Sequence, residues 1–152
     1  LEFRRVLFRS DDIRALVETG DYSDPRVVEY LVQTLAARRD KIGRSYFSKV
    51  LPLDAFRVAD GRLQFEDLSV LNGYRSARDH VVSWSKFDND SDTHTPLPEE
   101  ASLHVPQLMS SASDGDYFAA RIHAPSDARE TVTVYLRKKG ASCEIVGIER
   151  EW

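Results

Sequence analysis

The chain has 152 residues, of which 41% are hydrophobic and 30% charged, and its formal net charge at pH 7 is −4. A chain of this length buries about two-thirds of its unfolded surface, enough to fold without disulfides or a structural metal. The acidic balance argues against nucleic acid as the main partner. No apolar run reaches the roughly 18 residues of a spanning helix, so we expect a soluble chain without a membrane partner. The one cysteine, Cys143, excludes an internal disulfide.

The first ten residues read LEFRRVLFRS and match the translation of a common sequencing-library adapter over their full length. A basic arm or the remnant of a signal peptide is the alternative, but single apolar residues among three arginines form no continuous apolar region. We therefore expect residues 1–10 to be non-native. The natural chain then begins near Asp11, as a C-terminal fragment of metagenomic origin. Three of the 21 basic and one of the 25 acidic residues lie in this segment, so the rest carries a net charge of −6.

Two helices are predicted next. The stretch Asp11–Thr19 predicts a short helix that Gly20 ends in a left-handed conformation. The stretch Ser23–Leu53 predicts one long helix, because its first residues, SDP, supply a capping side chain and a proline for the first turn, and Pro52 ends it. Its apolar stripe consists of Val28, Leu31, Leu35, Ile42, Tyr46 and Val50. We expect a helical hairpin over residues 11–53, with the apolar faces opposed.

After Pro52 the apolar period changes from helical to two, which is typical of strands. The dipeptide Asp60-Gly61 predicts a tight hairpin turn between residues 56–58 and 63–65. Further strands are expected over residues 80–87, 103–105, 117–124, 131–137 and 143–150. The predicted fold class is α+β: an N-terminal helical hairpin followed by an antiparallel β-sandwich-like domain over residues 54–152.

One acidic stretch has the spacing of a calcium loop. Carboxylates at Asp88, Asp90, Asp92 and Glu99 occupy positions one, three, five and twelve, and Ca²⁺ needs several converging oxygens. Thr93 stands where the motif requires glycine for its sharp turn. A solvated acidic loop between two strands is therefore the alternative interpretation of the predicted metal ligands.

The sequence predicts no catalytic residue and no cofactor. Ser110 and its neighbours have no nucleophile-elbow motif, and the glycines are isolated, so no phosphate loop is present. A hydrolase whose groups converge from separate strands remains an alternative, and its histidines would come from His80, His94, His104 and His123, no two of which have metal-ligand spacing.

The helical half also carries a resemblance. The stretch Ile13–Leu53, with YSDP at 22–25 and RRDKIG at 38–43, resembles the C-terminal region of large uncharacterised bacterial proteins, in which a long helix precedes a β-rich tail. The resemblance implies a bacterial origin and a helix-then-sheet order. It also implies that a larger preceding domain carries the activity, so no catalytic residue is transferred to this chain.

Together these observations predict a non-catalytic C-terminal structural or interaction module of a larger bacterial protein. The expected partner is the upstream domain of the same polypeptide, with protein or carbohydrate as further candidates. The alternative is a ligand-binding module, through a calcium loop at 88–99 or a carbohydrate- or protein-binding surface on the β domain. The sequence favours neither a cytoplasmic nor an exported location.

Overall fold

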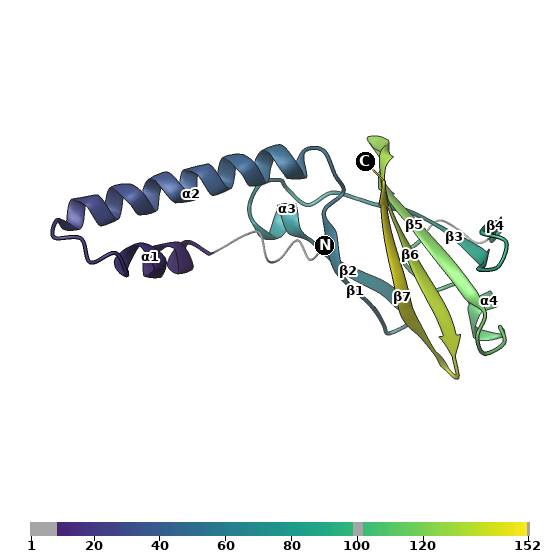
Figure 1. The fold of residues 1–152 in the computed structure, drawn as a ribbon. Coiled ribbons are helices and arrows are strands. Elements are labelled where there is room, and N and C mark those ends of the chain that lie inside the picture. The colour runs from purple at the N-terminus through teal and green to yellow at the C-terminus, as the bar shows by residue number, and fades with distance from the viewer. Residues whose placement is uncertain (1–8, 99–101, 152) are drawn as a thin grey trace. The chain divides into compact units, whose positions relative to one another are not determined.

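The computed structural model describes residues 9–98 and 102–151, so residues 1–8 of the adapter-like segment lie outside the described residues. The chain divides into two compact units, up to Ser48 and from Lys49. The first holds two helices, α1 (Ser10–Glu18) and α2 (Pro25–Phe47) (Figure 1). The second holds β1 (Leu53–Ala59), β2 (Arg62–Asp67), α3 (Leu68–Leu71), β3 (Val81–Asp88), β4 (Thr93–Pro96), α4 (Gln107–Ser110), β5 (Tyr117–Ala124), β6 (Asp127–Lys139) and β7 (Ser142–Glu151).

The start of α2 agrees with the helix start predicted from the sequence, and its end does not. The Asp24 side chain accepts a hydrogen bond from a backbone N–H of the first turn, 2.9 Å away, and a proline occupies the first helical position, as predicted. The predicted end was wrong, because α2 stops at Phe47, well before Pro52. The Ser48 hydroxyl donates to the Ser45 carbonyl at 2.8 Å, so a local side-chain bond replaces the next helical turn.

The loop between the two helices also differs from the prediction. Asp21, with φ 47°, adopts the left-handed conformation that was expected of Gly20. Aspartate tolerates this region better than most residues. Gly20 leaves room for the Tyr22 ring, because a Cβ there would lie 2.5 Å from its Cε2 and the exposed ring would have to shift.

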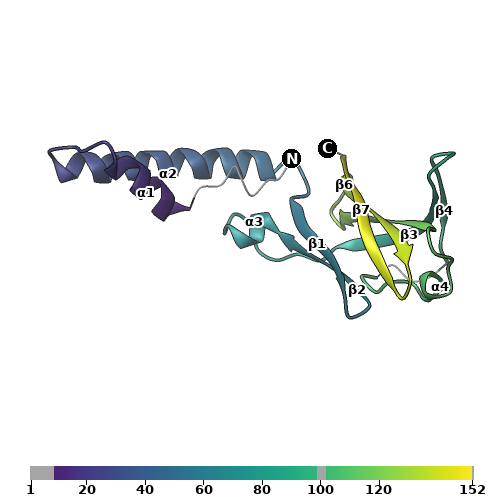
Figure 2. The same cartoon turned by 60° about the horizontal axis from the view of Figure 1, so that its bottom comes forward.

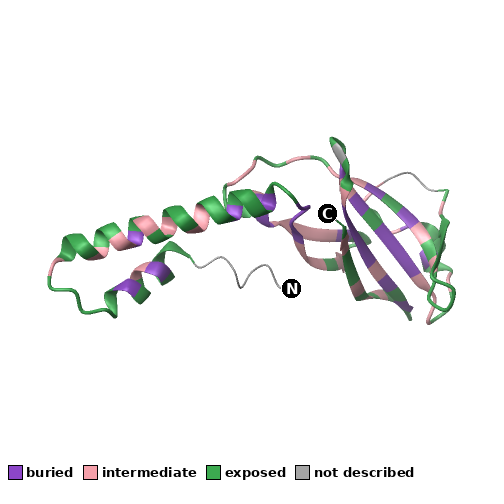
Figure 3. Ribbon diagram, turned by 45° about the horizontal axis from the view of Figure 1, so that its top comes forward, coloured by how far each residue is buried: buried purple, intermediate pink, exposed green. Residues whose placement is uncertain are grey.

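The core of the hairpin is small. Ile13, Val17 and Val32 form one buried cluster between the two helices, and Val28, Leu31 and Ala36 pack against it (Figure 3). The predicted apolar stripe was therefore partly wrong, because Leu35 is 39% exposed and Ile42 is 63% exposed. The reason is length: the nine residues of α1 bury only one stretch of the much longer α2.

Five antiparallel strands form one sheet in the order β4-β3-β5-β6-β7, and β3, β5, β6 and β7 lie side by side in Figures 1 and 2. The hairpin β1-β2 is a separate sheet, whose turn uses Asp60 (φ 52°) and Gly61 (φ 68°), which confirms the predicted turn. The expected strand at 103–105 is reduced to an isolated bridge between Arg62 and His104.

One face of the five-stranded sheet carries the larger core. Trp84, Ile122 and Val134 come from its central strands, and Leu53 and Leu63 come from β1 and β2; all five belong to a single buried cluster. The α+β class is thus confirmed, with a second sheet of only two strands. No helix in the described ranges is both long and apolar enough to cross a membrane.

Candidate functional site

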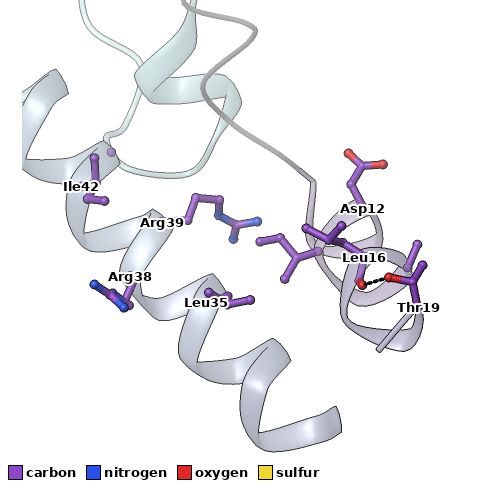
Figure 4. Close-up of a pocket in the computed structure, with 10 residues that line it drawn as sticks. Asp12, Leu16, Thr19, Leu35, Arg38, Arg39 and Ile42 are labelled. Atoms are coloured by element: carbon purple, nitrogen blue, oxygen red, sulfur yellow. Dashed lines mark hydrogen bonds between the residues drawn. The ribbon is translucent and has the colours of Figure 1, made fainter. Parts of the chain in front are cut away.

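An open apolar groove runs between α1 and α2. It has a volume of about 880 Å³ and is lined mainly by carbon, with Leu16 from α1 and Leu35 and Ile42 from α2 among its walls (Figure 4). Leu16 is 66% exposed and Ile42 is 63% exposed. Exposed aliphatic side chains gathered in one concave surface are typical of a protein-docking site.

Two polar contacts hold the helices on either side of this groove in place. The Arg14 guanidinium on α1 donates to the Glu29 carboxylate on α2 at 2.8 Å, and this pairing lowers the pKa of Glu29. The Arg39 guanidinium donates to the Ser10 hydroxyl at 3.2 Å, from α2 back to the first residue of α1. Both contacts are solvent-exposed and join α1 to α2 beside the groove.

The rims of the groove differ in charge. Asp12 lies on the α1 side, and Arg38 and Arg39 lie on the α2 side (Figure 4). Arg39 is already paired with Asp40 at 2.7 Å, whereas Arg38 is an exposed side chain. The groove thus presents an acidic rim and a basic rim on either side of an apolar floor.

A second hollow lies on the opposite face of the five-stranded sheet from the core. Its volume is about 410 Å³, and small side chains such as Ser83 and Ala119 form the floor between Arg121, Tyr135 and Glu149. The Tyr135 hydroxyl donates to Glu149 at 2.8 Å. The predicted carbohydrate- or protein-binding surface of the β domain stays a prediction.

Three of the four predicted calcium ligands lie at the hairpin between β3 and β4: Asp88 ends β3, and Asp90 and Asp92 are in the turn. Asp88 pairs with Thr93 across the hairpin, and the Asp88 carboxylate accepts backbone N–H bonds from Asp90 (2.9 Å) and Ser91 (3.3 Å), which lower its pKa. Asp92 has φ 54° in this turn. Glu99, the fourth predicted ligand, lies outside the described residues. In the described part of the chain no three His, Cys, Asp or Glu residues are arranged to hold a metal ion.

The four histidines lie on different parts of the β unit. His94 on β4 is 3.0 Å from the Ser85 hydroxyl, and His123 on β5 is 3.0 Å from the carbonyl of the next residue. His104 lies at the bridge to β2, and His80 packs edge-on against Phe65. Each histidine therefore has its own local surroundings.

Comparisons of this chain with protein-family models, curated proteins and solved structures returned no match.

Proposed function

We propose that this chain is a non-catalytic structural and interaction module of a larger bacterial protein, and that its helical hairpin pairs with a second copy of itself. The observation that carries the proposal is the apolar groove bounded by Leu16, Leu35 and Ile42. Two such grooves facing each other bury their leucines and isoleucines in a four-helix bundle.

The size of the hairpin favours such a partner. Helical units of fewer than about 40 residues seldom hold together on a core of their own, and oligomerisation is one usual remedy. The buried cluster between its two helices consists of three apolar residues, Ile13, Val17 and Val32, while the larger side chains Leu16 and Ile42 stay open to solvent. A second hairpin supplies the missing half of the core.

The charges of the rims favour a copy of the same chain as the occupant. A two-fold axis parallel to the helices places α1 of one hairpin over α2 of the other, so that each acidic rim faces a basic rim. Asp12 of one copy then lies opposite Arg38 of the other, twice per dimer. The surface is therefore complementary to itself in charge as well as in apolar character.

Sedimentation equilibrium of the full chain tests this proposal. We expect a monomer–dimer equilibrium, which Asp12→Arg and Arg38→Asp each weaken by bringing like charges together. The double variant Asp12→Arg/Arg38→Asp restores the dimer, because the opposite charges are exchanged and not lost.

The apolar part of the interface is tested with a matched pair of variants. Ile42→Glu places a charge in the groove and should give a monomer, whereas Tyr30→Glu changes an equally exposed residue of α2 that does not line the groove and should leave the dimer intact. A monomer at every concentration, or a dimer indifferent to Ile42→Glu, contradicts the proposal and redirects attention to a different protein as the occupant.

A further inference from the structure

The hollow on the face of the five-stranded sheet opposite the core, here called the sheet hollow, has the composition of a ligand site. Its volume of about 410 Å³ falls within the range of about 300–1,000 Å³ that small-molecule sites occupy. Two neighbouring rows of side chains, in register across the strands, form it: Ser83, Arg121, Thr133 and Glu149 in one row, and Ser85, Ala119 and Tyr135 in the next.

The aromatic wall of the sheet hollow is held in place by its neighbours. The Tyr135 ring lies 4.8 Å from the Phe87 ring, centroid to centroid. On β7 the same ring lies beside Gly147, where a Cβ would be 3.5 Å from its Cδ2 atom. A short side chain, Ala119, stands next to Tyr135 on β5. The sheet hollow therefore has a positioned aromatic wall beside a floor of small side chains.

One polar group of the sheet hollow is buried and still lacks a partner. Thr133 is only 7% exposed, and its hydroxyl forms no hydrogen bond with any described residue. The oxygen is not sealed off from solvent, and the side chain lines the sheet hollow, so it opens there. Most buried polar side chains are hydrogen-bonded, because burial without a partner costs free energy. Thr133 therefore offers an unused donor and acceptor to a ligand.

Charges of both signs border Thr133 and disfavour a charged ligand. Arg121 and Glu149 are its neighbours in register on the two adjacent strands. The Arg121 guanidinium donates to the Glu151 carboxylate at 2.9 Å, and the Tyr135 hydroxyl donates to Glu149 at 2.8 Å. A small anion beside Thr133 is repelled by Glu149, and a cation is repelled by Arg121. The sheet hollow therefore favours a neutral molecule.

The groups around Thr133 also define the polar chemistry of that molecule. The carboxylate of Glu149 only accepts hydrogen bonds, the guanidinium of Arg121 only donates them, and the hydroxyl of Thr133 does both. A sugar hydroxyl likewise does both, so neighbouring hydroxyls of one sugar ring satisfy a carboxylate and a guanidinium at once. The C–H face of the ring is apolar and packs on Ala119 and on the ring of Tyr135.

We propose that the sheet hollow binds a neutral sugar ring, whose hydroxyls bond to Thr133, Glu149 and Arg121 and whose C–H face packs on Tyr135. This site is separate from the groove of the helical hairpin and does not depend on pairing of that hairpin.

The methyl pyranosides of glucose, galactose and mannose are the probes, because they are neutral and differ from one another only in the orientation of hydroxyls. Titration of the ¹⁵N-labelled chain followed by NMR should show at least one of them shifting the backbone signals of Ser83, Thr133 and Glu149, with a Kd of about 1–10 mM. Glucuronate and glycine, which carry charges, should bind at least about tenfold more weakly. Equal or tighter binding of either one overturns the proposal, and so does the absence of shifts with all three glycosides at about 50 mM.

Thr133→Val tests the unpartnered hydroxyl. The two side chains have nearly the same shape, and the hydroxyl has no partner among the described residues, so the urea midpoint of unfolding should stay the same or rise. Binding of the glycoside should weaken by about two- to tenfold, as expected for the loss of one neutral hydrogen bond. The control is Thr95→Val, at an exposed threonine of β4 that does not line the sheet hollow, and it should leave the affinity unchanged. An unchanged affinity in Thr133→Val overturns the proposal.

A bulky side chain tests the location of the site. Ser83 is exposed and lines the sheet hollow, so Ser83→Phe should fill it and abolish binding of the glycoside. Ser126→Phe, at an exposed serine of the turn between β5 and β6, should not affect binding. If Thr133→Val does not fold, this serine pair still decides, because glycoside binding that survives Ser83→Phe overturns the proposal.

Discussion

The Oδ2 atom of Asp67 lies 3.8 Å from Nε of Arg78, while the other oxygen of the same carboxylate caps the N-terminus of α3. That oxygen, Oδ1, accepts from the backbone N–H of Ser69 at 2.9 Å and from its hydroxyl at 2.6 Å. One buried carboxylate thus caps a short helix and balances a largely buried guanidinium.

Replacement of Asp67 should therefore be costly. Asp67→Ala removes the cap and leaves the Arg78 charge buried without a counter-charge, which typically costs about 3–5 kcal/mol. We expect the urea midpoint of unfolding to fall accordingly, while Asp79→Ala, at a neighbouring exposed carboxylate, changes it little. An equal fall of the urea midpoint in the two variants would show that the pairing of Asp67 with Arg78 does not contribute to stability.

His80 should make the stability depend on pH. Burial and the positive charge of Arg78 lower its pKa, although Asp67 and Asp79 act in the opposite direction. Because the folded-state pKa lies below the unfolded value of about 6.5, the unfolded chain binds more protons in the window below that value. The contribution of neutral His80 to the free energy of unfolding is therefore complete above about pH 6.5, and it is lost as the pH falls from there through the folded-state pKa.

The measurement for this prediction is the free energy of unfolding between about pH 7 and pH 5, in wild type and in His80→Gln. The variant should lose less stability over this range than the wild-type chain, because the burial of its neutral side chain carries no protonation penalty. His104→Gln, at an exposed histidine, should follow the wild-type curve. Parallel curves for all three proteins would be inconsistent with the lowered pKa.

The two cores should respond very differently to truncation of a leucine. Leu63 on β2 is 1% exposed in the large core, so Leu63→Ala should destabilise the β unit by about 2–5 kcal/mol. Leu35 was expected in a core but is 39% exposed in the groove, so Leu35→Ala should cost much less in a monomer. Denaturant unfolding at low protein concentration distinguishes the two variants. A large loss of stability in Leu35→Ala would show that the groove is filled even at that concentration.

Features set by neighbouring residues were predictable from the sequence. The proline after Asp24 and the dipeptide Asp60-Gly61 determine backbone geometry within one turn, so the start of α2 and the turn of the β1-β2 hairpin were both predicted. The exposure of Leu35 was not predicted, because it depends on how far α1 covers α2. Periodicity identifies an apolar face but does not show whether another element covers it.

Features that join distant segments were missed for the same kind of reason. Asp67 and Arg78 carry no local pattern, because one ends a strand and the other lies in an irregular segment, and only the fold brings them together. β4 was missed because THTP is a short, fully exposed edge strand that includes a proline, and it lacks apolar alternation. The groove, by contrast, includes Leu35 and Ile42, which the periodicity did identify as apolar positions but which were expected in a core.

Tyr135 provides a test of the hollow on the exposed face of the sheet. Burial and the hydrogen-bonded Glu149 raise the pKa of Tyr135 to about 12, because both favour the neutral phenol over the phenolate. Ultraviolet titration should show a late phenol ionisation that Tyr135→Phe removes. Glu149→Gln should lower that pKa toward the ordinary value of about 10 without reaching it, since burial remains. The control is Glu144→Gln, nearer the start of β7, which should leave the late ionisation in place. If both glutamine variants shift the pKa of Tyr135 equally, overall charge, and not the contact with Glu149, sets that pKa.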